Sequence, residues 1–157
     1  MKILFVCLGN ICRSPLAEGI LRDKINKAGL QDKVTVDSVG FEPFHQGDSP
    51  DNRAIRVARE HGIDIKDHRA RLFTVEDFDQ SDLIYVMDRN NYSDVLAMVR
   101  DQEDINKVDY IMNVLRPGSD AAVPDPWYGY QQDFERTYQL LDTATTALLD
   151  DLKESIS

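Results

Sequence analysis

Residues 6–15 read VCLGNICRSP and join a short apolar run to a helix-start signal. The run from Lys2 to Val6 is β-prone and short enough to be a buried strand. Ser14 followed by Pro15 is the pattern of a helix N-cap with proline at the first helical position. An ordinary strand-to-helix connection needs no cysteine and no arginine, so we expect this one to hold an anion and to react with it.

The connection has the features of a phosphate-binding loop. Residues 8–13 offer backbone N–H groups in a tight turn, and Gly9 and Asn10 tolerate the unusual backbone angles of such a turn. The turn leads into a helix N-terminus, whose free N–H groups and dipole favour an anion. The predicted phosphate-binding residues are Leu8, Gly9, Asn10, Ile11, Cys12, Arg13 and Ser14.

Two side chains of this loop carry the predicted chemistry. Arg13 has a planar guanidinium that matches two oxygens of a phosphoryl group. Cys7 lies at the base of the loop, where positive surroundings favour its thiolate, a nucleophile in position for in-line attack at phosphorus. A cysteine alone at a strand end is more often a small buried side chain, but the spacing Cys-x5-Arg-Ser is more specific. The loop is not a Walker loop, because it has no Gly-Lys-Ser/Thr.

The rest of the chain alternates predicted strands and helices. This pattern predicts an α/β fold in one domain, residues 1–157, with a four-stranded parallel sheet, helices on both faces and the phosphate loop after the first strand. Ligands of such sheets bind beyond the carboxyl ends of the strands, where Met87-Asp88 and the loop 116–130 would meet Cys7. After the first strand and a helix over 14–28, we expect strands at 34–39, 83–87 and 110–115, helices from Ser49-Pro50 to Gly62, over 91–100 and over 132–152, and one helical turn at 74–78.

Composition narrows the function classes. The formal net charge is -10, which argues against nucleic acid and anionic membrane as partners. The N-terminal apolar run is too short for a membrane span and lacks a signal-peptide cleavage pattern, so we expect a cytoplasmic protein. Two cysteines make no disulfide scaffold, and the histidine and cysteine spacings fit no zinc site, so neither a metal nor a cofactor is expected.

Several motifs in order resemble those of the low-molecular-weight protein tyrosine phosphatases over essentially the whole chain. The resemblance implies a four-stranded parallel α/β fold and metal-free hydrolysis of phosphotyrosine through a phosphocysteine intermediate. It implies a tyrosine-phosphorylated protein or peptide as partner, phosphate or other oxyanions as product or inhibitors, and a monomer or weak self-association. The motifs are VCLGNICRSPLAE (6–18), DSVG (37–40), SPDNRA (49–54), DHRAR (67–71), VMDRNN (86–91) and VPDPWYG (123–129).

The resemblance also implies the catalytic roles. Cys7 would be the nucleophile, Arg13 the ligand of the phosphate and of the transition state, and Asp125 the general acid. Before Pro126, Asp125 alone would more often be a turn residue, but a phenolate leaving group needs a proton and a carboxyl group beyond a strand end can deliver it. The residues that match a supporting network of the family are Asn10, Ser14, Glu18, Ser38, His68 and Asp88.

Cys12 matches a second loop cysteine of the family, which can pair reversibly with the nucleophile under oxidation. A nearby thiol can trap the sulfenic acid of Cys7 before irreversible oxidation, although Cys12 also fits a small buried residue. We therefore expect peroxide to inactivate the protein reversibly through a Cys7–Cys12 disulfide.

Aromatic side chains are expected to form the rim of the substrate site. Trp127 and Tyr128 follow the acid directly, where the family usually has two tyrosines, and would stack on the phenyl ring. The loop 40–48, GFEPFHQGD, would supply the opposite rim through Phe44. Whether Trp127 narrows or broadens substrate choice stays open.

Three alternatives share the phosphate loop. An arsenate reductase of the same fold would need a thiol supplied from outside, because no cysteine follows Cys12. A phosphocysteine carrier would pass phosphate to a sugar, whereas Arg13 and an acid at Asp125 favour hydrolysis. A non-catalytic phosphate-binding protein would lack the nucleophile, the arginine or the acid.

Overall fold

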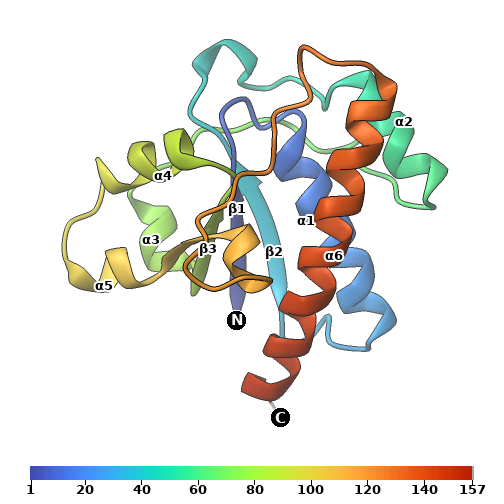
Figure 1. Ribbon diagram of the computed structural model, residues 1–157. Coiled ribbons are helices and arrows are strands. Elements are labelled where there is room, and N and C mark those ends of the chain that lie inside the picture. Colours follow the sequence, from blue (N-terminus) through green and yellow to red (C-terminus); the bar gives the residue numbers. More distant parts are fainter. Residues whose placement is uncertain (157) are drawn as a thin grey trace.

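The computed structural model describes residues 1–156 and contains a sheet of four parallel strands (Figure 1). The strand order is β2-β1-β3-β4, so the N-terminal strand lies inside the sheet. At the carboxyl edge, Val6 of β1 pairs with Val39 of β2 and Val86 of β3. The predicted fold class is confirmed. The strands are β1 (Lys2–Val6), β2 (Thr35–Val39), β3 (Leu83–Val86) and β4 (Val108–Tyr110).

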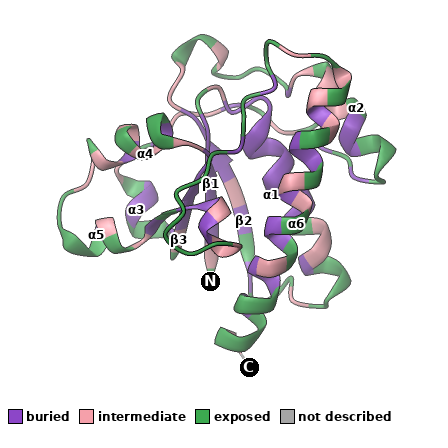
Figure 2. Cartoon of the chain, viewed as in Figure 1, coloured by how far each residue is buried: buried purple, intermediate pink, exposed green. Residues whose placement is uncertain are grey.

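Helices cover both faces of the sheet (Figures 1 and 2). Because side chains alternate along a strand, Ile3 and Phe5 of β1 pack into one core, while Leu4 and Val6 pack into another. All four side chains are fully buried, and burying each contributes about 1.5–3 kcal/mol. The first core contains residues of α1 (Arg13–Lys27), α2 (Asn52–Glu60) and α6 (Gln131–Ile156); α3 (Glu76–Gln80), α4 (Arg89–Leu96) and α5 (Gln102–Asn106) lie on the other side.

Two helices begin at other N-caps than the serines that the sequence predicted. Helix α1 begins at Arg13 with Cys12 at its N-cap, so Ser14 lies inside the helix and its hydroxyl is used by the phosphate loop instead. Helix α2 begins at Asn52, and Asp51 caps it by accepting a hydrogen bond from the N–H of Arg53. Serine and aspartate are equally good N-caps, so sequence alone does not choose between neighbouring candidates.

The fourth strand is present, but its predicted bounds, residues 110–115, are wrong. Strand β4 ends at Tyr110, and Ile111–Val114 form a 3-10 turn. Asn113 explains the bend, because its side-chain amide donates to Asp109 at 2.7 Å and to Asp120 at 2.8 Å. The short helix α5 was not predicted, since five residues are too few to show helical periodicity.

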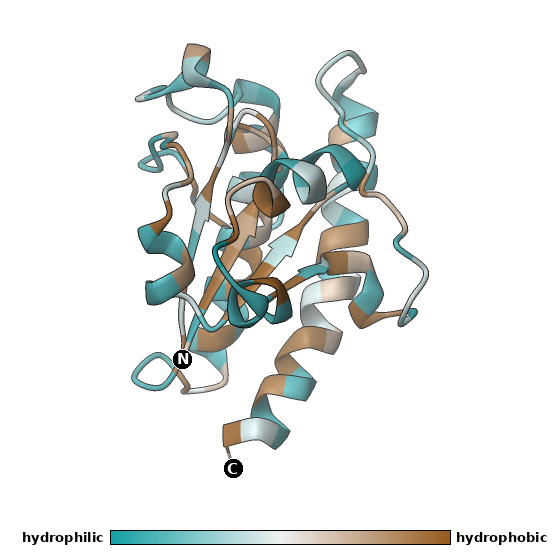
Figure 3. Ribbon diagram, turned by 90° about the vertical axis from the view of Figure 1, so that its left-hand side faces the viewer, coloured by the Kyte–Doolittle hydropathy of each residue, from teal (hydrophilic) through white to brown (hydrophobic). Residues whose placement is uncertain are grey.

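Hydrophobic residues are concentrated in the middle of the sheet, the helices alternate hydrophobic and hydrophilic residues, and the outer loops are mostly hydrophilic (Figure 3). No helix in residues 1–156 is long and apolar enough to cross a membrane. Loops from distant parts of the chain meet at the carboxyl edge of the sheet, where β1 ends at Val6.

Candidate active site

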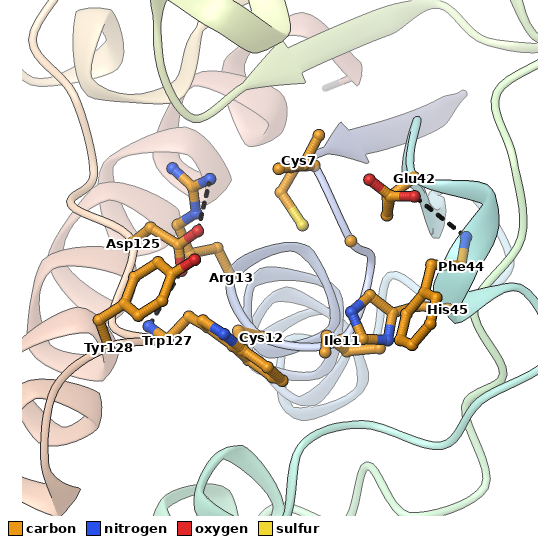
Figure 4. Close-up of a pocket in the computed structure, with 12 residues that line it drawn as sticks. Cys7, Ile11, Cys12, Arg13, Glu42, Phe44, His45, Asp125, Trp127 and Tyr128 are labelled. Atoms are coloured by element: carbon orange, nitrogen blue, oxygen red, sulfur yellow. Dashed lines mark hydrogen bonds and ion pairs between the residues drawn. The ribbon is translucent and has the colours of Figure 1, made fainter.

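A cavity of about 440 Å³ lies at this edge, over the loop that follows β1 (Figure 4). Three segments meet there: the loop after β1, the loop after β2 and the loop before α6. They bring together all three predicted catalytic residues. The lining residues are Cys7, Leu8, Gly9, Ile11, Cys12 and Arg13 from the first segment, Glu42, Phe44 and His45 from the second, and Asp125, Trp127 and Tyr128 from the third.

Cys7 is fixed at the floor of the cavity. It directly follows β1, and its N–H donates to the carbonyl oxygen of Val39 at 3.2 Å. Its Sγ accepts a hydrogen bond from the N–H of Asn10 at 3.3 Å and lies 2.9 Å from Oγ of Ser14. The residue is only 3% exposed, and it lines the cavity. The sulfur therefore has two polar partners and lies next to the N-terminus of α1, which begins at Arg13.

Asn10 holds the shape of the loop. Its φ of 55° lies in the left-handed region, where non-glycine backbone is strained, although asparagine tolerates this region better than most residues. Its amide nitrogen donates to Oγ of Ser14 at 2.8 Å and to Oγ of Ser38 at 3.0 Å. Its Oδ1 accepts from the N–H of Arg71 at 3.1 Å and lies 3.1 Å from Nε2 of His68. These four contacts offset the backbone strain.

Gly40 lets β2 approach the same loop closely. A Cβ at residue 40 would lie 2.7 Å from the carbonyl oxygen of Leu8 and 3.0 Å from the backbone nitrogen of Asn10. That oxygen accepts hydrogen bonds from the N–H groups of Phe41 and Glu42, so the segment after β2 is attached to the phosphate loop. Only glycine fits at position 40 without moving the loop.

The supporting network continues from Asn10 to a buried carboxylate. Ser38 donates from Oγ to Oε1 of Glu18 at 2.6 Å, and Arg22 donates to Oε2 of Glu18 at 2.6 Å. Nδ1 of His68 lies 3.6 Å from Glu18. Burial lowers the pKa of His68 although the Glu18 carboxylate opposes this shift. A neutral His68 carries its proton on Nε2, because only there can it donate to Oδ1 of Asn10.

Arg13 is 97% buried from solvent in its side chain and is held by two other loops. One guanidinium nitrogen donates to Asp88 at 2.8 Å and to the carbonyl oxygen of Val123 at 2.9 Å. The other lies 3.7 Å from Oδ2 of Asp125. Burial opposes its charge, but Cys7 and the two carboxylates together raise the pKa of Arg13. The guanidinium therefore stays charged and fixed beside the cavity.

Asp125 lies on a loop that other residues hold in place. Its carboxylate is 41% exposed and accepts a hydrogen bond from the N–H of Trp127 at 3.1 Å. Before it, the N–H of Val123 donates to the carbonyl oxygen of Met87 at 2.8 Å. After it, Arg53 donates to the carbonyl oxygen of Trp127 at 3.0 Å. The carboxyl group thus faces the cavity from a fixed backbone while remaining open to solvent.

Cys12 lines the cavity but is a poor nucleophile. It is 5% exposed, and burial, with Asp51 nearby, raises the pKa of its thiol. Both cysteines are free thiols in the structure. A disulfide between Cys7 and Cys12 therefore stays a prediction.

Exposed aromatic side chains surround the mouth. Phe44 is 82% exposed and Tyr128 95%, whereas Trp127 is 37% exposed and contacts the ring of His45 at a centroid distance of 5.6 Å. This contact joins the loop after β2 to the loop that carries Asp125 (Figure 4). The predicted rim residues all line the cavity.

The sequence interpretation missed several residues of the site, among them Arg53, Glu42 and Val123. Arg53 belongs to a motif that was recognised, SPDNRA, but nothing in the motif shows which loop its side chain binds. Val123 contributes a backbone oxygen, which carries no side-chain signal. In the part of the chain that the structure describes, no group of three or more His, Cys, Asp or Glu side chains is arranged to hold a metal ion.

Comparison with known proteins assigns the chain to a family. Residues 2–157 match the family described as low molecular weight phosphotyrosine protein phosphatase. A Synechocystis protein named for this family is 44% identical over 156 residues, 99% of each chain. The crystal structure of an Entamoeba histolytica protein tyrosine phosphatase with Hepes in its active site has a TM-score of 0.91 at 34% identity, covering 99% of this chain and 98% of that one. Vibrio vulnificus Wzb in complex with benzylphosphonate has a TM-score of 0.82 at 30% identity, covering 96% and 97%. The chain therefore belongs to the low-molecular-weight phosphotyrosine protein phosphatases, a family of cysteine-dependent hydrolases.

Proposed function

We propose that this member of the family hydrolyses phosphotyrosine and aryl phosphates in two steps, with Cys7, Arg13 and Asp125 as its catalytic residues. The single observation that carries the proposal is that these three side chains line one cavity, with the thiol on its floor and the carboxyl group near its mouth. The cavity reaches from exposed aromatic side chains down to Cys7, as a site for a phosphorylated ring requires.

In the first step, the Cys7 thiolate attacks phosphorus. The S–P bond forms while the bond from phosphorus to the phenolic oxygen breaks, and Asp125 gives its proton to that oxygen, so phenol leaves. Arg13 and the backbone N–H groups of residues 8–13 bind the three equatorial oxygens, where charge spreads in the transition state. Arg13 enters this step already held by Asp88 and Val123.

In the second step, water hydrolyses the phosphocysteine. The Asp125 carboxylate takes a proton from water as the O–P bond forms and the S–P bond breaks, which returns the Cys7 thiolate. Ser14 stabilises that leaving thiolate, since its Oγ lies 2.9 Å from the sulfur. Asn10 orients Ser14 for this task by donating to the same oxygen, which leaves the hydroxyl proton free to point at sulfur.

The proposed substrate is a phosphotyrosine in a protein or peptide. The rim aromatics Phe44, Trp127 and Tyr128 offer surface for stacking on a phenyl ring. The structure of the relative from Vibrio vulnificus is a complex with benzylphosphonate, a compound that combines an aromatic ring with a phosphonate. The two free thiols suit a reducing compartment, so we propose that the enzyme works in the cytoplasm.

The test is release of p-nitrophenol from its phosphate ester at mildly acid pH, with a chelator present, by wild type and Cys7→Ser. Hydrolysis by the wild type that survives the chelator and disappears in Cys7→Ser supports the proposal. Wild-type protein that becomes phosphorylated without releasing phosphate would point to the carrier alternative. Conversion of arsenate to arsenite with added thiol, in the absence of ester hydrolysis, would point to the reductase.

A further inference from the structure

The mouth of the cavity is built to contact more of a substrate than its phosphorylated ring. Large apolar side chains gather around the opening and remain exposed: Leu8 is 45% exposed, Phe44 82% and Tyr128 95%. Exposed apolar groups clustered at a ligand site mark a surface that binds a partner. Because the proposed substrate is a polypeptide, the residues next to the phosphotyrosine are the groups that would cover this surface.

The charge of the mouth is unevenly distributed. The positive charge of Arg13 is buried at the depth of the phosphate and lies against two carboxylates, Asp88 at 2.8 Å and Asp125 at 3.7 Å. Arg53, beside the acid loop, is bound to both carboxylate oxygens of Asp51 and to two backbone carbonyl oxygens. Neither guanidinium is therefore available to a neighbouring residue of the substrate.

Glu42 is a second charged group at the mouth, besides Asp125. It lines the cavity on the loop after β2, across the opening from Asp125 (Figure 4). One oxygen accepts a hydrogen bond from the N–H of Phe44 at 3.1 Å, and within residues 1–156 no lysine, arginine or histidine forms an ion pair with it. A carboxylate accepts about four hydrogen bonds, so Glu42 keeps capacity for a donor from outside.

The position of Glu42 is fixed by the phosphate loop itself. Its backbone N–H donates to the carbonyl oxygen of Leu8 at 2.9 Å, and its side chain caps the 3-10 turn Pro43–His45. A rim with this fixed carboxylate repels acidic neighbours of the phosphotyrosine and attracts basic ones.

We propose that Glu42 gives this enzyme a preference for phosphotyrosine sites with a lysine or arginine next to the phosphotyrosine. The proposal rests on the phosphotyrosine phosphatase function and adds the class of sequence that it takes. Glu42 acts by binding the neighbouring cation, while Phe44 and Tyr128 cover the apolar parts of the same segment. The effect of Glu42 should appear in kcat/KM for peptides and not for a small aryl phosphate, which has no neighbouring residue for Glu42 to bind.

The experiment compares peptides Ala-Ala-pTyr-Ala-Ala in which one alanine at a time is replaced by lysine or by glutamate. The measured quantity is the ratio of kcat/KM for the lysine peptide to that for the glutamate peptide at each position. At one or more positions we expect a ratio of roughly ten in wild type, the size expected when a rim attraction replaces a repulsion. Raising the salt from about 0.1 M to about 1 M shortens the Debye length from about 10 Å to about 3 Å and should reduce the ratio.

Glu42→Gln is the decisive variant, because glutamine keeps the oxygen that accepts from Phe44 but lacks the charge. Its ratio should fall to about two or less. Glu103→Gln is the matched control on α5, exposed and outside the site, and should keep the wild-type ratio. Phe44→Ala should lower kcat/KM for all peptides without changing the ratio.

The outcomes separate this inference from the function on which it rests. A wild-type ratio near one, a preference for glutamate, or an unchanged ratio in Glu42→Gln would overturn the inference while leaving the phosphatase function intact. Loss of hydrolysis of p-nitrophenyl phosphate in the wild type would overturn the function itself. In that case, binding of the same phosphopeptides to Cys7→Ser, measured by calorimetry, would still decide whether lysine neighbours are preferred.

Discussion

The guanidinium of Arg53 donates a hydrogen bond of 3.0 Å to the carbonyl oxygen of Trp127, two residues beyond Asp125. A second bond of 3.0 Å reaches the carbonyl oxygen of Gly129, and the same group lies 4.5 Å from the centre of the Phe134 ring. Asp51 orients it through two further bonds, and the N–H of Asp51 donates to Ile11 in the phosphate loop. Arg53 therefore joins the loop that carries the acid to the loop that carries the nucleophile.

Replacing Arg53 by lysine should impair the acid more than the nucleophile. Lysine cannot make the paired hydrogen bonds of a planar guanidinium, so Asp125 would be less well placed to protonate the leaving group. We expect kcat to fall roughly tenfold for phenyl phosphate and less for p-nitrophenyl phosphate. The plot of log kcat against leaving-group pKa checks this, with Arg56→Lys on the same helix as control. An equal loss for both esters would limit Arg53 to a structural role.

Removing the acid itself should give the stronger form of the same effect. In Asp125→Asn the rate should fall by about 10²–10⁴ for poor leaving groups and much less for good ones. Wild-type turnover needs a thiolate and a carboxylic acid at once, so its rate profile should be bell-shaped with an optimum on the acid side of neutral. Asp125→Asn should lose the fall in rate on the alkaline side of the profile, which comes from deprotonation of the acid. An optimum above neutral would exclude Asp125 as the acid.

Ser14 should matter most in the second step. Its hydroxyl lies 2.9 Å from the Cys7 sulfur and can stabilise the departing thiolate. In Ser14→Ala the phosphocysteine should accumulate, which rapid-quench kinetics would detect as a burst of p-nitrophenol followed by slow turnover. Ser38→Ala is the control, because Ser38 contacts Asn10 and Glu18 rather than the sulfur. Absence of a burst in Ser14→Ala would contradict this prediction and would mean that the hydroxyl acts in the first step or stabilises the fold.

Oxidation should join the two cysteines. Peroxide is expected to convert Cys7 to a sulfenic acid. The Cys12 sulfur then attacks the Cys7 sulfur, so that the S–S bond forms, the S–O bond breaks and the hydroxyl leaves as water with the thiol proton. Intact mass should fall by two hydrogens, and activity should return with thiol. Cys12→Ser should instead lose activity irreversibly under the same treatment. Equal recovery of wild type and Cys12→Ser would show that Cys12 has no protective role.

His68 should make stability depend on pH below neutrality. Its pKa in the folded protein is lowered by burial, so the unfolded chain binds its proton more readily than the folded chain does. The contribution of neutral His68 to the free energy of unfolding is fully present above its ordinary pKa of about 6.5. It is lost as the pH falls from there through the lower pKa of the folded protein. Urea unfolding at pH values between 7.5 and 5 should show that the free energy of unfolding falls less in His68→Gln than in wild type. The glutamine amide can still donate to Asn10. Identical slopes would mean that His68 does not titrate in this range.

The sequence predicted the parts of this molecule that depend on local patterns. The strand Lys2–Val6, the phosphate loop and the helix behind it follow one another along the chain, so spacing alone reveals them. The parallel sheet follows from the alternation of strands and helices. The residues that line the cavity from the loop after β1 were all expected.

What could not be predicted depends on contacts between distant residues. The oxygen of Ser14 serves the sulfur of Cys7 and the amide of Asn10, so the helix-start signal that it provides is misleading. The side chain of Asn113 turns the chain where a strand was expected. Arg53 contacts the loop that carries Asp125, about 75 residues away, and Glu42 contacts the phosphate loop, about 35 residues away. Contacts over such separations along the chain leave no periodic pattern in the sequence.

The left-handed backbone of Asn10 has a consequence for the kinetics of ligand capture. All four contacts that hold it are made within the protein, so the conformational entropy of the loop is lost during folding and not when an oxyanion arrives. Such preorganisation lets association proceed without a slow rearrangement, at a rate set by diffusion and by the field around the cavity. Oxyanion inhibitors should then differ in affinity chiefly through how long they stay bound.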